Sequence, residues 1–459
     1  MRALLSRKFG TCMTDSQLAV IVLAAGQGTR MKSALPKVLH SIGARPMLAH
    51  VLATAKALGA VRIVVVTAPN AEPVAALARE WGAESVVQDR QLGTGHAVRA
   101  AESALAKFDG NLLVLYGDAP LVTVETLHRL AARAGGSNIA ALGFRARDPK
   151  GYGRMIVDGD EVVRIVEDKD ASAEERRVAL CFAGPLVAGA RTLFNLLHKL
   201  ENKNAQGEFY LTDVFTIARK QGLRCAVVEG TEKEMLGVNS RAQLAEAEAA
   251  FQARRRSELM DQGVGFVAPD TVYLSADTII EADATIGPYV VFGPGAKIGS
   301  GTQIRAFCHV EGAEVGRGAI IGPFARLRPG AKIEDEVHIG NFVEVKNARI
   351  GRGAKANHLA YVGDACVGPA ANIGAGAITC NYDGTNKHFT EIGAGVFIGS
   401  NATLVAPVKI GDGAYVAAGS TITDNVVADA LALGRARQVV KEGKVGTLRA
   451  RLKTKKKDA

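Results

Sequence analysis

The chain has 459 residues, of which 48% are hydrophobic, and this length predicts two or three domains with sizeable cores. Its formal net charge is +10 but only 5% of its residues are aromatic, which favours anionic small-molecule substrates and argues against a nucleic-acid partner. The six cysteines are scattered without a CxxC pair, and no apolar run is long enough to cross a membrane, so we expect a cytoplasmic protein that has no structural zinc and no membrane partner.

The first predicted element is a buried strand over residues 19–23, a continuous apolar run of the kind found in parallel sheets. It leads into the glycine-rich string LAAGQGTRM (residues 23–31), and a helix-compatible stretch then runs past Pro36 and Lys37. The backbone N–H groups of such a turn, with a basic side chain nearby, can bind phosphate. The alternative is a tight strand-to-helix turn in which Arg30 and Lys37 are merely solvated.

The next segments alternate between helix and strand. We expect helices over 47–58 and 74–81 and strands over 61–66 and 85–87, which is the pattern of an α/β domain. A second glycine loop, QLGTGHA (residues 91–97), precedes another predicted helix. The histidine in this loop, His96, is expected to have a structural role at the start of that helix.

A further apolar strand over residues 111–116 is followed by Gly117 and Asp118. This order places a carboxylate at the carboxyl edge of a parallel sheet, where open α/β sheets bind their ligands. One carboxylate there is enough to hold Mg²⁺, which takes its remaining oxygens from water and substrate phosphates. The alternative is an aspartate that caps the following turn.

The C-terminal half shows a period of six between about residues 279 and 423, after a predicted connecting helix over 241–260. Aliphatic residues fall six apart without a break at Ile392, Ile398, Leu404, Ile410, Val416 and Ile422. The period slips by one residue after Val310 and again after Val345. Six fits neither an amphipathic helix nor a simple strand, but it fits stacked coils of short strands. Hexapeptide repeats of this type resemble left-handed parallel β-helices; a glycine-rich loop region is the alternative.

Residues that interrupt the six-residue pattern are candidates for chemistry. Arg328 and Lys346 can bind a phosphate, His358 can accept a proton, and Tyr361 and Asn372 can bind sugar hydroxyls. Acyl transfer from a thioester to an amine needs a base that removes the ammonium proton, and a neutral histidine is suited to that task. A lone histidine would more often be a satisfied structural residue, and a thiol-acyl role for Cys380 is a further alternative.

From about Val20 to Arg435 these strings, in this order, closely resemble the family of bifunctional N-acetylglucosamine-1-phosphate uridylyltransferase/glucosamine-1-phosphate N-acetyltransferases. The resemblance implies acetyl transfer from acetyl-CoA to glucosamine 1-phosphate, and then uridylyl transfer from UTP to N-acetylglucosamine 1-phosphate with release of pyrophosphate. It also implies one Mg²⁺ per uridylyl site and a homotrimer. The implied fold is a Rossmann-like α/β nucleotidyltransferase domain with a mostly parallel sheet, followed by a left-handed parallel β-helix.

The resemblance carries over the following site residues in the N-terminal half. Those implied to contact the nucleotide are Leu23, Ala24, Ala25, Gly26, Arg30, Lys37, Gln88, Gly93, Thr94, Tyr116, Gly117 and Asp118, with Gln88 and Thr94 reading the base. Those implied to face the sugar are Gly153, Glu167 and Asn239, and the segment 208–213 is also implied to line this side. The implied metal ligands are Asp118 and Asn239.

One position departs from the family pattern. Where the family has an Asn-Ser/Thr-Gly string that contacts the N-acetyl sugar, this chain has Phe182, Ala183 and Gly184. A phenylalanine side chain cannot donate the amide hydrogen bond. The expected consequence is a change in sugar affinity or selectivity in this half.

In the C-terminal half the resemblance makes His358 the general base. The residues implied to hold glucosamine 1-phosphate are Arg328, Lys346, Tyr361 and Asn372. Those implied to contact acetyl-CoA or the nascent product are Ala375, Asn381, Tyr382, Ser400, Ala418 and Arg435.

The expected domain organisation has five parts. They are an N-terminal extension (1–17), a uridylyltransferase domain (18–240), a linker helix (241–262), a β-helix acetyltransferase domain (263–435) and a basic tail (436–459). Three other functions compete with this interpretation: a nucleotidylyltransferase for another sugar whose coils only assemble it, a zinc-binding coil protein of the carbonic-anhydrase kind, and a trimeric scaffold.

Overall fold

The computed structural model describes residues 17–134 and 138–455, with side chains to 453, so nearly all of the predicted N-terminal extension lies outside the described residues. The chain divides into two compact units, Met1–Arg255 and Arg256–Ala459, and the boundary falls within α7 (Arg241–Asp261). None of the helices in the described residues is long and apolar enough to cross a membrane.

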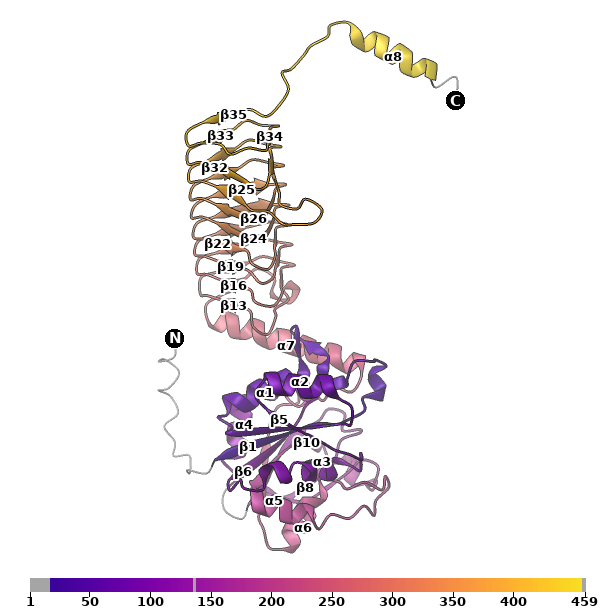
Figure 1. The fold of residues 1–459 in the computed structure, drawn as a ribbon. Coiled ribbons are helices and arrows are strands. Elements are labelled where there is room, and N and C mark those ends of the chain that lie inside the picture. Colours follow the sequence, from indigo (N-terminus) through magenta and orange to yellow (C-terminus); the bar gives the residue numbers. More distant parts are fainter. Residues whose placement is uncertain (1–16, 135–137, 456–459) are drawn as a thin grey trace. The chain divides into compact units, whose positions relative to one another are not determined.

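A nine-stranded sheet forms the centre of the first unit, in the order β5-β4-β1-β6-β10-β7-β11-β9-β8 (Figure 1). Its strands are β1 (Leu18–Ala24), β4 (Arg62–Thr67), β5 (Glu84–Val87), β6 (Asn111–Tyr116), β7 (Ile139–Arg145), β8 (Arg154–Asp158), β9 (Glu161–Val166), β10 (Leu180–Gly189) and β11 (Cys225–Glu229). The strands β5, β4, β1 and β6 are parallel, as is the β7–β11 pair, whereas β10 runs antiparallel to β6 and β7. The predicted α/β domain is confirmed.

Helices cover both faces of this sheet. They are α1 (Met47–Ala57), α2 (Glu72–Glu80), α3 (Thr94–Ala100), α4 (Val124–Ala131), α5 (Ala190–Leu197) and α6 (Asp213–Lys220), with a short hairpin, β2 (Ser41–Ile42) and β3 (Arg45–Pro46), before α1. Successive residues of β1 alternate between two cores: Ala19 and Ile21 pack with α3, α5 and α6, and Val20 and Val22 pack with α1, α2 and α4. This double burial is the reason for the continuous apolar run in the sequence.

The stretch after the first glycine turn differs from the expected continuous helix. It forms two single-turn 3₁₀ helices, Thr29–Met31 and Lys37–Leu39; three further ones are Ser103–Leu105, Glu175–Arg177 and Pro269–Thr271. Gly28 and Lys32, at the two ends of the first turn, both have positive φ, and Pro36 immediately precedes the second. Left-handed backbone at Lys32 ends the helix, and proline cannot donate the hydrogen bond that would continue it.

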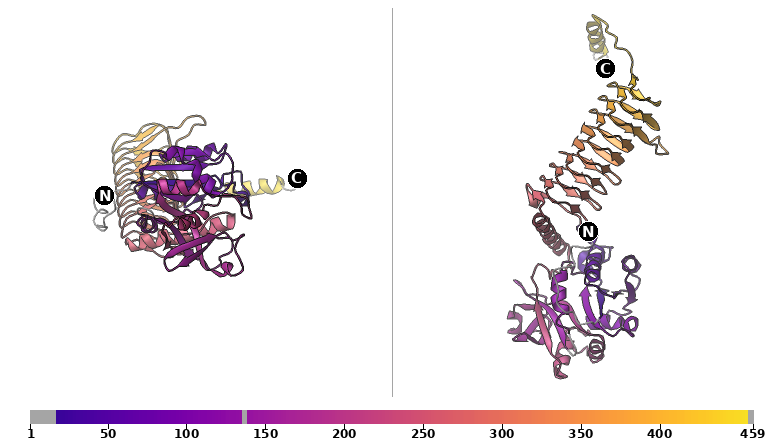
Figure 2. Two further views of the ribbon diagram at one scale, coloured as in Figure 1. Left: turned by 90° about the horizontal axis from the view of Figure 1, so that it is seen from below. Right: turned by 90° about the vertical axis from the view of Figure 1, so that its left-hand side faces the viewer.

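The second unit is a stack of coils whose strands pair in parallel from one coil to the next (Figures 1 and 2). One side is formed by β12 (Gly265–Phe266), β14 (Thr285–Ile286), β17 (Gln303–Ile304), β20 (Ile320–Ile321), β23 (His338–Asn341), β25 (Lys355–His358), β27 (Asn372–Ile373), β30 (Phe397–Ile398), β33 (Tyr415–Val416) and β35 (Leu431–Ala432). The remaining strands belong to a second, branched sheet. They are β13 (Ile279–Ile280), β15 (Val291–Phe292), β16 (Lys297–Ile298), β18 (His309–Val310), β19 (Glu314–Val315), β21 (Arg326–Leu327), β22 (Lys332–Ile333), β24 (Glu344–Ile350), β26 (Tyr361–Val367), β28 (Ile378–Cys380), β29 (Thr390–Ile392), β31 (Thr403–Val405), β32 (Val408–Ile410) and β34 (Thr421–Ile422).

The six-residue period sets the register of these coils. Ile286 pairs with Ile304 and Ile398 pairs with Val416, in each case three repeats further along the chain. The aliphatic side chains of the repeat line one continuous interior, where Ile286, Ile398 and Val416 are each fully buried. The predicted left-handed parallel β-helix therefore has the parallel stacked strands that the repeat requires. A helix, α8 (Lys444–Lys455), follows the last coil.

Candidate active sites

The carboxyl ends of β1 and β6 bring the two sequence-predicted loops of the first unit together. The Gly117 amide donates a hydrogen bond to the Leu23 carbonyl (2.9 Å), so the residues after both strands are adjacent. The Val238 amide donates to the Asp118 carbonyl (2.9 Å), which brings in the Gly-Val-Asn string from far along the chain. A Cβ on Gly117 would lie 3.1 Å from the Leu23 carbonyl oxygen, so a side chain there would fit only if the neighbouring strand moved slightly.

Asp118 and Asn239, the two predicted metal ligands, face the same cation. That cation is the Lys37 ammonium, which forms an ion pair with the Asp118 carboxylate and donates to the Asn239 amide oxygen at 2.9 Å. Two oxygen ligands that converge on one positive charge form a donor set that fits Mg²⁺. The structure therefore places Lys37 beside the predicted metal ligands, whereas Arg30 is exposed and makes no hydrogen bond or ion pair with any described residue.

The second glycine loop is held in place by Gln88 and Thr94, the two residues predicted to contact the base. The buried Gln88 side chain donates to the Gly93 carbonyl (3.1 Å) and lies 3.1 Å from His96 Nδ1. The Thr94 hydroxyl accepts from the Leu211 amide (3.1 Å), which ties the loop to the segment 208–213. Both side chains thus have structural partners, as does His96, whose pKa is lowered chiefly by burial. Gly93 has a φ of 104° that favours glycine.

Tyr116, the last residue of β6, packs against the neighbouring strand β10. Its ring packs over Gly184, where a Cβ would lie 2.9 Å from two ring carbons and where φ is 108°. Burial, with the nearby Glu167 and Asp118 carboxylates, raises the pKa of the Tyr116 hydroxyl far above its ordinary value. Tyr116 is therefore a neutral, packed residue at this edge.

Two of the residues predicted to face the sugar, Gly153 just before β8 and Glu167 just after β9, lie close together next to Phe182 of β10, whereas Asn239 lies beside Lys37 and Asp118. A Cβ on Gly153 would lie 3.5 and 3.6 Å from the two Glu167 carboxylate oxygens, and the Gly153 carbonyl accepts from the Phe182 amide (2.8 Å). The Glu167 carboxylate accepts a hydrogen bond from the Thr212 hydroxyl (3.0 Å), and burial raises its pKa. The Phe182 ring is 8% exposed and meets Phe215 edge to face at 6.2 Å, so it packs in the apolar core.

Two basic side chains of the second unit approach each other closely. The pKa of the Lys346 ammonium is lowered, chiefly because the Lys387 amino group lies against it and carries a like charge. Arg328 adds a third positive charge nearby and pairs with Glu344 at 2.8 Å. Like charges this close repel each other unless an anion lies between them. Lys387 lies in the segment between β28 and β29, which is longer than one repeat, and sequence reasoning did not select it.

His358 is exposed on β25 and is oriented by one neighbour. Its Nδ1 lies 2.7 Å from the Asn341 amide oxygen, and the two residues are partners in the β23–β25 pairing. Sequence reasoning missed Asn341, although the coil register could have identified it, because it occupies the position of His358 one coil earlier. An amide oxygen only accepts hydrogen bonds, so Nδ1 carries the proton and Nε2 is left as the acceptor.

The other predicted residues of this unit lie on the same and later coils. The Tyr361 hydroxyl covers Gly363, where a Cβ would lie 2.3 Å away, and Gly363 is the strand partner of Lys346. Asn372 lies on β27, beside Lys355 of the strand that carries His358. Further contacts fix the predicted acetyl-CoA residues: Asn381 with Asp364, Tyr382 with Gly384, Ala375 with Asn401, Ser400 with Gly419, and Arg435 with Ala418.

No group of three or more His, Cys, Asp or Glu side chains in the described part of the chain is placed to hold a metal ion. A metal in the first unit would therefore depend on Asp118 and Asn239 together with substrate oxygens. Cys380, the alternative nucleophile, lies on β28 and is half-buried.

Comparison with known proteins gives independent information about both units. Residues 20–215 match a family model described as a MobA-like NTP transferase domain, and residues 277–312, 312–347 and 389–424 match a model described as bacterial transferase hexapeptide (six repeats). A relative from Jannaschia sp. is 53% identical over 96% of this chain and 97% of its own length. One from Azorhizobium caulinodans is 55% identical over 95% and 98%, and one from Agrobacterium fabrum is 52% identical over 97% and 98%. Each of these relatives carries the name "Bifunctional protein GlmU".

Proposed function

The chain belongs to the family of bifunctional GlmU proteins. From this premise we propose which of its two units carries out each of the two reactions. The protein is a nucleotidyltransferase and an acetyltransferase of UDP-N-acetylglucosamine synthesis. The β-helix acetylates glucosamine 1-phosphate from acetyl-CoA, and the α/β unit transfers the uridylyl group of UTP to the product. The observation that best supports this division is the presence of two separate sets of basic side chains, at Lys37 and at Lys346 with Lys387.

In the α/β unit the reaction is an in-line displacement. The phosphate oxygen of N-acetylglucosamine 1-phosphate attacks the α-phosphorus of UTP, and pyrophosphate leaves. Asp118 and Asn239 would hold Mg²⁺, which supplies charge neutralisation to the phosphates when it is bound. Lys37 and Arg30 stabilise the charge that develops on the phosphate oxygens. The convergence of Asp118, Asn239 and Lys37 supports this assignment.

In the α/β unit the sugar is bound by Gly153, Glu167 and their neighbours. Among the described residues the Glu167 carboxylate accepts a hydrogen bond from Thr212 alone, which leaves further lone pairs for sugar hydroxyls. Phe182 packs into the core and offers no polar side-chain atom to the N-acetyl group. We therefore expect the acetamide to be recognised by fewer direct hydrogen bonds in this chain.

In the β-helix His358 is the general base. The Asn341 oxygen holds Nδ1–H, so Nε2 is available to remove a proton from the amino group of glucosamine 1-phosphate. The amine then attacks the thioester carbonyl carbon, and the thiolate of CoA leaves. Arg328, Lys346 and Lys387 bind the phosphate of the sugar and relieve their mutual repulsion in doing so.

The working assembly is a homotrimer. Four exposed aromatic residues, Tyr289, Phe307, Phe324 and Phe342, stack face to face along one corner of the coils with centroids 5.0, 4.8 and 5.2 Å apart. Each has positive φ, which costs a bulky residue about 1 kcal/mol. An exposed row of apolar side chains that is maintained at a conformational cost indicates a surface that a partner covers. The variant Phe324→Ser is expected to shift the full chain from trimer toward monomer in sedimentation; an unchanged trimer would contradict this role.

The test of the paired reactions follows UDP-sugar formation from glucosamine 1-phosphate, UTP and Mg²⁺, with and without acetyl-CoA. UDP-N-acetylglucosamine should form only when acetyl-CoA is present, with CoA and pyrophosphate in equal amounts. Equal pyrophosphate release without acetyl-CoA would contradict the proposed order of the two reactions.

A further inference from the structure

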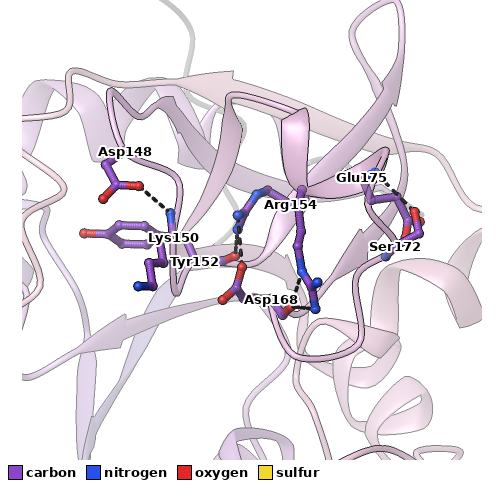
Figure 3. A network of polar contacts seen from close by, with 8 residues as sticks. Asp148, Lys150, Tyr152, Arg154, Asp168, Ser172 and Glu175 are labelled. Atoms are coloured by element: carbon purple, nitrogen blue, oxygen red, sulfur yellow. Dashed lines mark hydrogen bonds and ion pairs between the residues drawn. The ribbon is translucent and has the colours of Figure 1, made fainter.

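The proposed sugar side contains a buried charge that the reaction does not use. The Arg154 side chain is only 2% exposed, and its guanidinium pairs with the Asp168 carboxylate at 3.0 Å. It also donates to the Tyr152 carbonyl (Figure 3). Its Nε has no hydrogen-bond partner among the described residues. Arginine is rarely buried unless it is paired, so a buried arginine next to a ligand site calls for a physical reason.

The two members of this ion pair are each next to a sugar-side residue. Arg154 follows Gly153 at the start of β8, and Asp168 follows Glu167 directly after β9. Figure 3 shows the Arg154 side chain extending toward Asp168. The Gly153 backbone and the Glu167 carboxylate are thus joined through one side-chain contact as well as through the β8–β9 ladder, in which Arg154 pairs with Val166.

Asp168 is also held through its backbone. Its carbonyl accepts two hydrogen bonds from the Arg176 guanidinium, at 3.3 and 3.2 Å. The turn after it is closed by the Asp170 amide, which donates to the Glu167 carbonyl at 3.0 Å. One charged pair and three backbone contacts therefore fix the main chain on the C-terminal side of Glu167.

We propose that Arg154 and Asp168 are positioning residues for uridylyl transfer, which set the place of the Glu167 carboxylate relative to the Gly153 backbone and so determine the affinity for the sugar phosphate. The inference rests on the proposed function of the α/β unit. Neither residue needs to touch the sugar. Charge-assisted hydrogen bonds of this kind have a defined geometry, and small displacements of a binding carboxylate weaken the contacts that it makes.

The test compares Asp168→Asn with Arg164→Ala. Asp168→Asn keeps an oxygen for Arg154 but removes the charge, and we expect the KM for N-acetylglucosamine 1-phosphate to rise about tenfold with the KM for UTP unchanged. Arg164, on β9, forms an exposed pair with Glu175 at 2.6 Å, so its loss should change neither KM. The KM for UTP, which is bound by the same unit, reports whether the α/β unit of each variant folds. A sugar KM that stays at the wild-type value, or that rises together with the UTP KM, would overturn the proposal.

A second measurement separates this proposal from the proposed function. Amide hydrogen exchange at Asp170 should become faster in Asp168→Asn than in Arg164→Ala, whatever substrate the unit uses, because the Asp170 amide depends on the fixed turn. If the wild-type chain releases no pyrophosphate with N-acetylglucosamine 1-phosphate, the proposed function is refuted. The exchange result then decides the positioning role by itself. Equal exchange in both variants would overturn the positioning role.

Discussion

The two units of this chain build their sites in different ways. In the α/β unit the site residues lie at strand ends and loops, and several of them are packed: Gln88 is 3% exposed and the Lys37 side chain is 10% exposed, although Arg30 is exposed. In the β-helix the interior is filled by the aliphatic residues of the repeat, so the chemistry has to lie outside it, where His358 and Lys387 are exposed. The first site is therefore organised by packing within its unit, whereas the second depends more on the substrate that binds to its exposed side chains.

This contrast predicts that the two activities can be removed separately. Replacing His358 by alanine removes the general base, and general bases contribute on the order of 10² to 10⁴ in rate. Acetyl transfer should fall by that factor while pyrophosphate release from UTP and N-acetylglucosamine 1-phosphate stays at the wild-type rate. Both rates are measured on one preparation. A parallel loss of both activities would show that the two sites are not independent.

The matching variant in the other unit is Asp118→Asn. It removes the carboxylate that faces Lys37 and, by our proposal, holds Mg²⁺, so uridylyl transfer should fall on the order of 10²-fold. Acetyl transfer should not change. The concentration of Mg²⁺ that gives half-maximal pyrophosphate release should rise, and titration of the metal measures this. Unchanged metal dependence would contradict the ligand assignment.

A smaller effect is expected from the lysine pair. Lys387→Ala removes one of the three positive charges around the proposed phosphate position, so the KM for glucosamine 1-phosphate should rise about tenfold, which corresponds to about 1.4 kcal/mol. The matched control is Lys409→Ala, another coil lysine, which forms an exposed pair with Glu391. If both variants have the same KM for glucosamine 1-phosphate, Lys387 does not bind the phosphate of the sugar.

The smallest predicted effect concerns pH. Burial raises the pKa of Glu167 in the folded chain, so at intermediate pH the folded state binds more protons than the unfolded state. Its contribution to stability is therefore present below the unfolded pKa and decreases as pH rises through the raised folded pKa. The variant Glu167→Gln should show less loss of unfolding free energy over that range, in denaturant titrations at several pH values. Identical pH dependence in both proteins would contradict the burial of this carboxylate.

The sequence predicts the β-helix well because one pattern, an aliphatic residue at every sixth position, recurs along it. The positions of Ile398 and Val416 follow from the six-residue period, and burial in the stack confirms them. Lys387 and its contact with Lys346 do not follow, because the insertion breaks the period between Ile373 and its strand partner Ile398. The register across the insertion, from Ile373 to Ile398, is set by tertiary pairing and not by spacing.

The same limit applies to the α/β unit. The resemblance brought Asp118 and Asn239 together, and the structure has both facing Lys37, but the period and composition of the chain give no sign of this convergence. Arg154 was not selected from the sequence because arginine is normally exposed. Its burial depends on the pairing of β8 with β9 and β10 and on the position of Asp168, which are long-range contacts.

The most direct test of the central claim measures pyrophosphate release from UTP and Mg²⁺ with three acceptors: N-acetylglucosamine 1-phosphate, glucosamine 1-phosphate and glucose 1-phosphate. Our account predicts a strong preference for the acetylated sugar, which would show that Phe182 is accommodated and that the product of the β-helix is the substrate of the α/β unit. No preference, or a preference for glucose 1-phosphate, would contradict the pairing of the two reactions in one chain.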